Sequence, residues 1–178
     1  NGAGKTTLMR TIMGFIPYSQ GIISFNKDLL ISDTSHKRTS LGIGYMPEDR
    51  RLVPDLSVLE NIMLPSWAAN TNNDQSSISW IFDIIPELDD LSNRKAYSLS
   101  GGQQKLVAIA RSLTTGNKLL LLDEPFEGVA PALANRILEL IINLKRNNLI
   151  AVITESDETH SSDFADFVFN LERGEITN

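Results

Sequence analysis

Residues 119–125 read Leu-Leu-Leu-Leu-Asp-Glu-Pro. Four apolar residues bounded by a turn are typical of a strand that is buried on both faces of a parallel sheet. Ligands of open α/β sheets bind beyond the carboxyl ends of the strands, which is where Asp123 and Glu124 lie. We expect Asp123 to hold Mg²⁺, directly or through water, and Glu124 to orient a water molecule or accept its proton. The alternative is an ordinary acidic turn at the end of a strand.

Helices and strands alternate on both sides of this run. Upstream, apolar residues recur with helical spacing between Leu106 and Leu113. Downstream, Pro131 suits the first position of a second amphipathic helix, and residues 149–153 read as another buried strand. Shorter strands are expected at 21–26, 42–46 and in a hairpin around Gly174. This alternation predicts an α/β fold with a mainly parallel sheet.

Residues 49–99 lack the pattern of a buried strand and predict a helical insertion. A helix is expected over residues 57–69, broken at Pro65, and a second over 78–85, with a polar loop at 70–77 between them. The chain is therefore expected to be a single domain, 1–178. Its α/β core comprises residues 1–48 and 100–178, and its helical subdomain comprises 49–99.

The first seven residues, Asn-Gly-Ala-Gly-Lys-Thr-Thr, match the second half of the phosphate-binding pattern G-x-x-x-x-G-K-[ST]. The first glycine of the pattern would precede Asn1, so we expect the chain to begin inside a larger protein. Gly2 and Gly4 let successive N–H groups point at one anion, Lys5 adds a charge for the β- and γ-phosphates, and Thr6 offers a hydroxyl to Mg²⁺. The residues expected to bind the phosphates of a nucleotide here are Asn1, Gly2, Ala3, Gly4, Lys5, Thr6 and Thr7. A glycine-rich turn before a helix is the alternative.

Composition excludes several classes of protein. Of the 178 residues, 16 are Lys or Arg and 22 are Asp or Glu, which gives a net charge of −6 and argues against nucleic-acid binding through bulk charge. Apolar residues make up 42% and charged residues 21%, as in ordinary globular proteins. The absence of cysteine excludes disulfides and thiolate metal sites. No apolar run approaches the length needed to span a bilayer.

Residues 99–104, Leu-Ser-Gly-Gly-Gln-Gln, complete a set of three motifs with 1–6 and 120–125. In this order the motifs resemble the nucleotide-binding subunit of ATP-binding cassette (ABC) transporters, over essentially the whole chain. The strings at 45–51, 57–62 and 123–131 are similar to the ATPases of branched-chain amino-acid and urea importers, although Glu-Asp-Arg also occurs in sugar importers. The resemblance implies a P-loop NTPase fold whose first strands lie upstream of Asn1.

The resemblance also implies roles for residues outside the phosphate loop. Two such subunits sandwich two ATP molecules head to tail, so that one subunit binds the γ-phosphate held by the other. The residues implied for this contact are Ser100, Gly101, Gly102 and Gln103, and the alternative for Ser100 is a helix cap. Glu48 stands where most family members have a glutamine that contacts Mg²⁺ and the attacking water. Ser156 stands where the family usually has a switch histidine, while His36 and His160 are expected at the surface.

The implied function is ATP hydrolysis that powers import of a small polar solute, with branched-chain amino acids as the expected solute. The implied partners are a second ABC ATPase subunit in a homo- or heterodimer, transmembrane permease subunits and, indirectly, a periplasmic binding protein, with no nucleic acid. The chain would lie at the cytoplasmic face of the inner membrane. Membrane subunits would dock near residues 48–53 and the helical insertion, where Arg50 and Arg51 could pair with acidic residues of the partner; the alternative is a solvated basic pair.

Three alternatives remain open at this point. Ser156 favours a nucleotide-binding, hydrolysis-poor regulatory half of a heterodimeric cassette pair. A soluble ABC ATPase acting on ribosomes or DNA is disfavoured by the acidic charge and by the single cassette. The last alternative is a gene fragment without independent activity.

Overall fold

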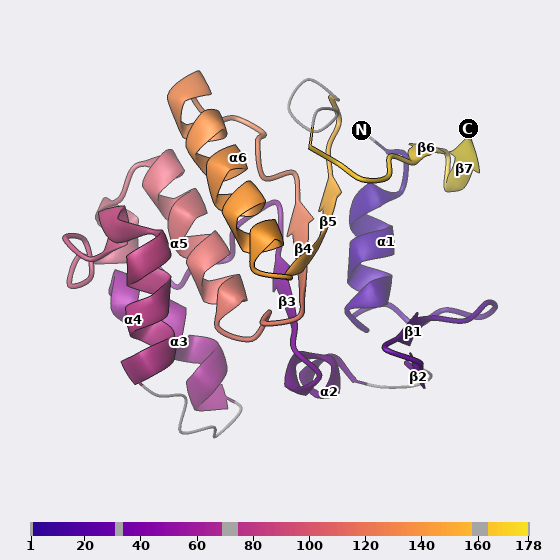
Figure 1. The fold of residues 1–178 in the computed structure, drawn as a ribbon, viewed down its shortest axis with the longest axis horizontal. Helices are drawn as coiled ribbons and strands as arrows, with labels where there is room; N and C mark the ends of the chain where they lie inside the picture. Colours follow the sequence, from indigo (N-terminus) through magenta and orange to yellow (C-terminus); the bar gives the residue numbers. More distant parts are fainter. Residues whose placement is uncertain (1, 31–33, 69–74, 158–163, 178) are drawn as a thin grey trace.

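A three-stranded parallel sheet forms the centre of the computed structural model, which describes residues 2–30, 34–68, 75–157 and 164–177. The strands are β3 (Ile43–Met46), β4 (Leu119–Asp123) and β5 (Ile150–Thr154), in the order β3-β4-β5. In the middle of β4, Leu121 is paired with Tyr45 on one side and with Val152 on the other. The predicted α/β fold with a mainly parallel sheet is therefore confirmed, and all three strands end at the same edge (Figure 1).

Strand β4 is buried on both faces, as its apolar run predicts. Leu120 and Leu122 belong to the core formed with α5 (Gly101–Leu113) and α6 (Pro131–Arg146), whereas Leu119 and Leu121 pack in a second core with α1 (Lys5–Ile12). This alternation follows from the two-residue period of a strand. Figure 1 shows the resulting layers, with α5 and α6 on one side of the sheet and α1 on the other.

Two helices, α3 (Val58–Ala68) and α4 (Gln75–Ile84), fill the predicted insertion, with short 3₁₀ helices η1 (Pro86–Leu88) and η2 (Ala96–Ser98). They pack on the far side of α5 from the sheet (Figure 1). The predicted break at Pro65 is wrong, because Ile62 and Ser66 on either side of the proline are both buried and hold the helix together. The predicted loop over 70–77 is wrong from Gln75 on, and residues 70–74 lie outside the described part of the chain. The boundaries of a separate helical subdomain stay a prediction.

Two hairpins flank the core. The strand expected over 21–26 is instead a hairpin of β1 (Ser24–Phe25) and β2 (Asp28–Leu29), because Asn26 and Lys27 both take positive φ, as a type I′ turn requires. The polar segment between this hairpin and β3 contains a short helix, α2 (Ser35–Ser40). The hairpin predicted around Gly174 is confirmed as β6 (Asn170–Glu172) and β7 (Glu175–Thr177).

Candidate active site

A cavity of about 220 Å³ lies at the N-terminal end of α1. Gly2 and Gly4 take φ of 79° and 102°, in the left-handed region that glycine adopts without strain, and α1 begins directly afterwards at Lys5. The loop thus presents backbone N–H groups and the positive end of a helix dipole to the cavity, which is the environment that a phosphate prefers. The residues that line it are Gly2, Ala3, Gly4, Lys5, Thr6, Thr7, Glu48 and Glu124.

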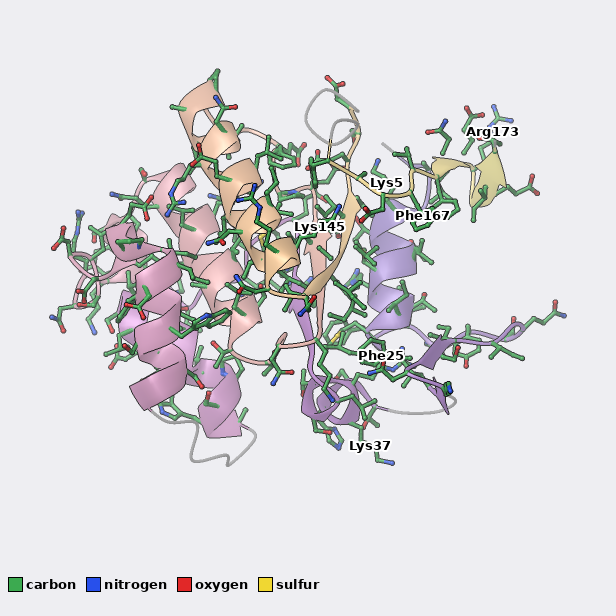
Figure 2. The ribbon with its side chains drawn as sticks, in the orientation of Figure 1. Lys5, Phe25, Lys37, Lys145, Phe167 and Arg173 are labelled. Atoms are coloured by element: carbon green, nitrogen blue, oxygen red, sulfur yellow. The ribbon has the colours of Figure 1, made fainter. Side chains whose placement is uncertain are left out.

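The structure brings three predicted site residues into direct contact at this cavity. The Lys5 ammonium lies 3.2 Å from Glu124 Oε1 and donates to Ser156 Oγ at 3.0 Å. The Ser156 hydroxyl donates to Glu124 Oε1 at 2.8 Å, and the Ser156 backbone N–H donates to Oε2 at 3.0 Å. Figure 2 shows Lys5 at the end of α1 that lies beside the segment after β5. Residues 5, 124 and 156 therefore form one polar cluster.

Glu124 is held as a buried carboxylate in this cluster. Only 4% of the residue is exposed. Burial raises its pKa, but the hydrogen bonds from Ser156 and Lys5 outweigh burial, and the pKa of Glu124 lies below its ordinary value. Its φ of 51° is unusual for a residue with a side chain, and it turns the chain sharply where β4 ends. The carboxylate is therefore charged and fixed, as a group that orients a water molecule must be.

Asp123 is fully buried beside this cluster. It accepts hydrogen bonds from the Thr154 hydroxyl at 2.6 Å and from the Tyr45 hydroxyl at 3.2 Å. Burial, and then the negative charge of Asp123, raise the pKa of Tyr45, so its hydroxyl remains a donor. Because both carboxylate oxygens already accept a hydroxyl and Asp123 does not line the cavity, its geometry suits a contact to Mg²⁺ through water.

The donor set of the cavity suits Mg²⁺ rather than a metal bound by protein alone. Across residues 2–30, 34–68, 75–157 and 164–177, no group of three or more His, Cys, Asp and Glu side chains could hold an ion. Mg²⁺ usually keeps several waters and takes one or two protein oxygens plus substrate phosphates. Thr6, which lines the cavity, and Asp123 behind it could supply that small number of oxygens.

The residues implied to bind a second nucleotide do not line this cavity. Ser100 caps α5: its Oγ accepts the Gln103 N–H at 3.2 Å, and Gln103 Oε1 accepts the Ser100 N–H at 3.0 Å. Ser100 therefore caps the helix, as the alternative interpretation predicts. Since the hydroxyl of a cap can still donate, a role toward a partner's nucleotide stays a prediction for residues 100–103.

Arg50 and Arg51, which we expected at a docking surface, are both engaged within the chain. Arg50 donates to Gly101 O at 3.0 Å and to Gln104 Oε1 at 3.3 Å, and Arg51 pairs with Asp49 at 3.0 Å. Arg50 therefore links the segment after β3 to the start of α5.

His36 does not line the cavity. His36 is paired with Thr34 on an exposed helix, and His160 lies outside the described residues.

Three residues at the site were not anticipated from the sequence. Lys105 donates to the backbone oxygens of Glu124 and Glu127, Glu155 Oε1 accepts the Phe126 N–H, and the Gly174 N–H donates to Ala3 O at 2.8 Å. Lys105 directly precedes the apolar run 106–110, and no local sequence pattern marked Lys105, Glu155 or Gly174 as part of the site. These three residues support the loops that carry the cluster.

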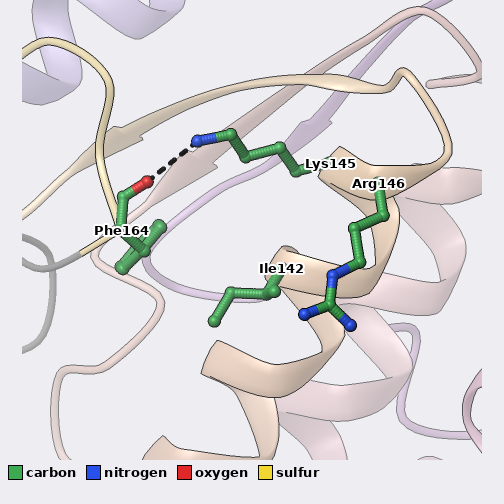
Figure 3. Close-up of a pocket in the computed structure, with 4 residues that line it drawn as sticks. All are labelled: Ile142, Lys145, Arg146 and Phe164. Carbon is green, nitrogen blue, oxygen red and sulfur yellow. Dashed lines mark hydrogen bonds between the residues drawn. The ribbon is translucent and has the colours of Figure 1, made fainter.

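A second cavity, of about 450 Å³, lies beside the C-terminal half of α6. It is lined by Ile142, Lys145, Arg146 and Phe164, and Lys145 donates to the Phe164 carbonyl across it (Figure 3). None of the residues predicted to bind nucleotide lines it.

Comparison with known protein families decides the assignment. Residues 1–127 match the family described as ABC transporter. The chain belongs to the ABC transporter family. It is the ATP-binding subunit of such a transporter and an ATPase that uses ATP and Mg²⁺. None of the helices described here has both the length and the apolar character needed to cross a membrane.

Curated relatives of this ABC subunit differ in what they transport. It is 32% identical to the high-affinity branched-chain amino acid transport ATP-binding protein BraG of Pseudomonas aeruginosa, covering 99% of this chain and 76% of the relative. It is 30% identical to a probable branched-chain amino acid transport ATP-binding protein, LivF, of Archaeoglobus fulgidus (99% and 75%). It is also 30% identical to the lipopolysaccharide export system ATP-binding protein LptB of Haemophilus influenzae (99% and 74%).

Solved structures share the fold of this ABC subunit. The ADP conformation of MJ1267, an ATP-binding cassette of an ABC transporter, superposes with a TM-score of 0.84 at 28% identity, covering 99% of this chain and 75% of that one. A dimeric post-hydrolysis state of the cassette MJ0796, bound to ADP and Pi, gives a TM-score of 0.86 at 22% identity (99% and 79%). The predicted P-loop fold is therefore confirmed.

Proposed function

We propose that this ABC subunit hydrolyses ATP to power import of a small polar solute, with branched-chain amino acids as the solute class. The main observation that supports the proposal is the cluster of Lys5, Glu124 and Ser156 at the cavity beside the phosphate loop. The names of BraG and LivF support amino-acid import. The similarity to LptB supports a second candidate, export of a larger substrate, at nearly the same identity.

In the proposed mechanism the N–H groups of residues 2–7 and the Lys5 ammonium bind the ATP phosphates. Mg²⁺, held by Thr6 and through water by Asp123, would neutralise charge on the β- and γ-phosphates. In the structure Lys5 pairs with Glu124. Phosphate oxygens compete for Lys5, and the carboxylate of Glu124 is then free to orient the attacking water. Glu48, exposed at the rim of the same cavity, is placed to contact that water.

We further propose a head-to-tail dimer in which Ser100, Gly101, Gly102 and Gln103 of one subunit bind the γ-phosphate held by the other. The exposed N-terminus of α5 has N–H groups but no lysine directly after its glycines, where the phosphate loop has Lys5, which suits half of a shared anion site. The dimeric state of MJ0796 supports this arrangement. Permease subunits, a periplasmic binding protein and a position at the cytoplasmic face of the membrane complete the proposal.

The test separates ATP binding from ATP hydrolysis. Lys5→Ala removes a charge-assisted contact worth about 1.5–3 kcal/mol, so ATP affinity by calorimetry should fall by roughly 10- to 100-fold. Glu124→Gln keeps the shape of the side chain but loses the proton acceptor, so phosphate release should stop while ATP binding persists. Glu172→Gln, at an exposed position, is the matched control and should behave as the parent. Parental hydrolysis by Glu124→Gln would exclude Glu124 as the group that handles water.

The solute is tested with the assembled transporter. ATP hydrolysis by the complex of this subunit with its membrane subunits should rise when a binding protein loaded with leucine or valine is added. The empty binding protein is the control. Stimulation by lipopolysaccharide alone would instead favour the export candidate.

A further inference from the structure

A lysine is buried directly behind the proposed catalytic carboxylate. Lys105 lies one turn into α5 and is 4% exposed. Its ammonium donates to the backbone oxygen of Glu124 at 2.7 Å and to that of Glu127 at 2.8 Å. A buried lysine loses its hydration, so it is kept only where fixed partners replace the water. Here those partners are two carbonyls of one turn.

The turn that Lys105 binds has an unusual backbone conformation at Glu124. Glu124 takes φ of 51° although it is not glycine, a conformation that costs free energy and persists only where its surroundings hold it. The Glu124 N–H donates to Thr154 O at 3.0 Å, and its carbonyl accepts the Lys105 ammonium. Both backbone groups of Glu124 are therefore fixed from outside the turn, and its carboxylate is directed at Lys5 and Ser156 as a result.

A second contact completes the support of this turn. Glu155 Oε1 accepts the Phe126 N–H at 3.0 Å, so the turn is held from the β5 side by Glu155 and from the α5 side by Lys105. Burial lowers the pKa of Lys105, and the nearby carboxylates of Glu155 and Glu127 oppose this shift. Of Lys105 and Glu155, only Lys105 lies on α5, the helix whose N-terminus is formed by Ser100–Gly102.

We propose that Lys105 is a positioning residue for ATP hydrolysis, which holds the backbone of Glu124 so that its carboxylate can orient the attacking water. This inference rests on the proposed role of Glu124 in hydrolysis. It also makes α5 a mechanical link: the N-terminus of α5 is expected to bind one nucleotide, and Lys105 on the same helix fixes the carboxylate that acts on the other. A movement of α5 would therefore shift Glu124 through the side chain of Lys105.

The test compares Lys105→Met with Lys105→Gln in the full chain. Met keeps the length and apolar stem but cannot donate, whereas Gln keeps two N–H donors on a shorter side chain. We expect Lys105→Met to lower kcat by roughly 10- to 100-fold, since a displacement of about 1 Å can cost that much. KM for ATP should stay near the parental value because Lys105 does not line the cavity. Lys105→Gln should recover most of the rate, and Lys118→Met, at an exposed position, is the control.

Hydrogen exchange of the nucleotide-free protein gives a readout that does not depend on activity. The amides of Glu124 and of residues 126–129 should exchange faster in Lys105→Met than in the parent, with β4 and α1 unchanged, and remain slow in Lys105→Gln. Parental kcat in Lys105→Met, or a lowered kcat without faster local exchange, would overturn the inference. Equal loss of kcat and thermal stability in both Lys105 variants would show a merely structural role and would also overturn it. If Glu124→Gln hydrolyses ATP normally, the proposed function fails instead, whatever Lys105 does.

Discussion

Ser156 contributes more contacts than its size suggests. A serine at the switch position is too short to reach a γ-phosphate directly, which predicts weak orientation of the transition state. In the structure its hydroxyl and backbone N–H both bind the carboxylate of Glu124, and Lys5 donates to the same hydroxyl. Ser156 thus binds the carboxylate of the site through both its side chain and its backbone.

Ser156→His is expected to raise phosphate release by up to ~10²-fold at saturating ATP, the lower end for one positioned catalytic group. The imidazole would reach the phosphate, and the backbone N–H of residue 156 would still bind Glu124. Phosphate release by parent and variant at equal ATP saturation measures the effect. Ser156→Ala, which adds no donor, should show no gain. An unchanged rate in Ser156→His with unchanged ATP affinity would show that serine already suffices.

Glu155 makes stability depend on pH in the neutral range. Burial raises its pKa to about 7 from the ordinary 4.5, the Phe126 N–H opposes this, and Glu124 adds to it. Because the folded pKa is the higher one, the stabilisation by the protonated form is complete below about pH 4.5 and is lost as the pH rises through 7. Glu155→Gln keeps the acceptor for Phe126 without the charge. It should therefore be more stable than the parent at pH 8 by about 1–2 kcal/mol, after discounting for solvent screening, and about equal to it at pH 5. Urea unfolding at both pH values measures this, and the same difference at pH 5 and pH 8 would contradict it.

At the scale of elements, the sequence predicts those helices and strands that are set by a local pattern of residues. The run 119–122, the spacing in α5 and Pro131 at the start of α6 each act over one element, and all three elements form where predicted. The β1–β2 hairpin was missed because its turn uses Asn26 and Lys27, without the glycine that usually marks a type I′ turn. The contact of Lys105 with Glu124 joins two elements and leaves no periodic trace, so no local pattern could predict it.

Strand β3 and helix α5 pack closely because Gly44 of the strand has no side chain. A Cβ at Gly44 would lie 2.1 Å from Ser112 O and 2.7 Å from the Cα of Gly116. Gly44→Ala must therefore push the strand away from the helix, and we expect a loss of roughly 1–3 kcal/mol or more in the free energy of unfolding. Gly101→Ala is the control, since its Cβ would meet only the end of Arg50 at 3.3 Å. Chemical denaturation measures both, and equal stability of Gly44→Ala and the parent would contradict the packing argument.

At the scale of the whole molecule, the proposed dimer predicts a nucleotide-dependent change in size. Glu124→Gln should accumulate as a dimer with ATP and Mg²⁺ and return to monomer with ADP, because release follows hydrolysis. Adding Ser100→Asp should prevent the dimer, since aspartate also caps a helix well but places negative charge against the γ-phosphate. Light scattering of the full chain measures the mass. A dimer that persists in the double variant would remove Ser100 from the interface.

The hydrogen bond from Gly174 to Ala3 joins the hairpin β6–β7 to the phosphate loop. A force that pulls the hairpin and the phosphate loop apart would act first on this bond and on the loop it holds, because the bond joins the two segments directly. In a single-molecule stretching experiment the nucleotide pocket would therefore yield before the core, and bound ATP would register as a higher first rupture force. Occupancy of the pocket would then be measurable as mechanical resistance between the phosphate loop and the hairpin β6–β7.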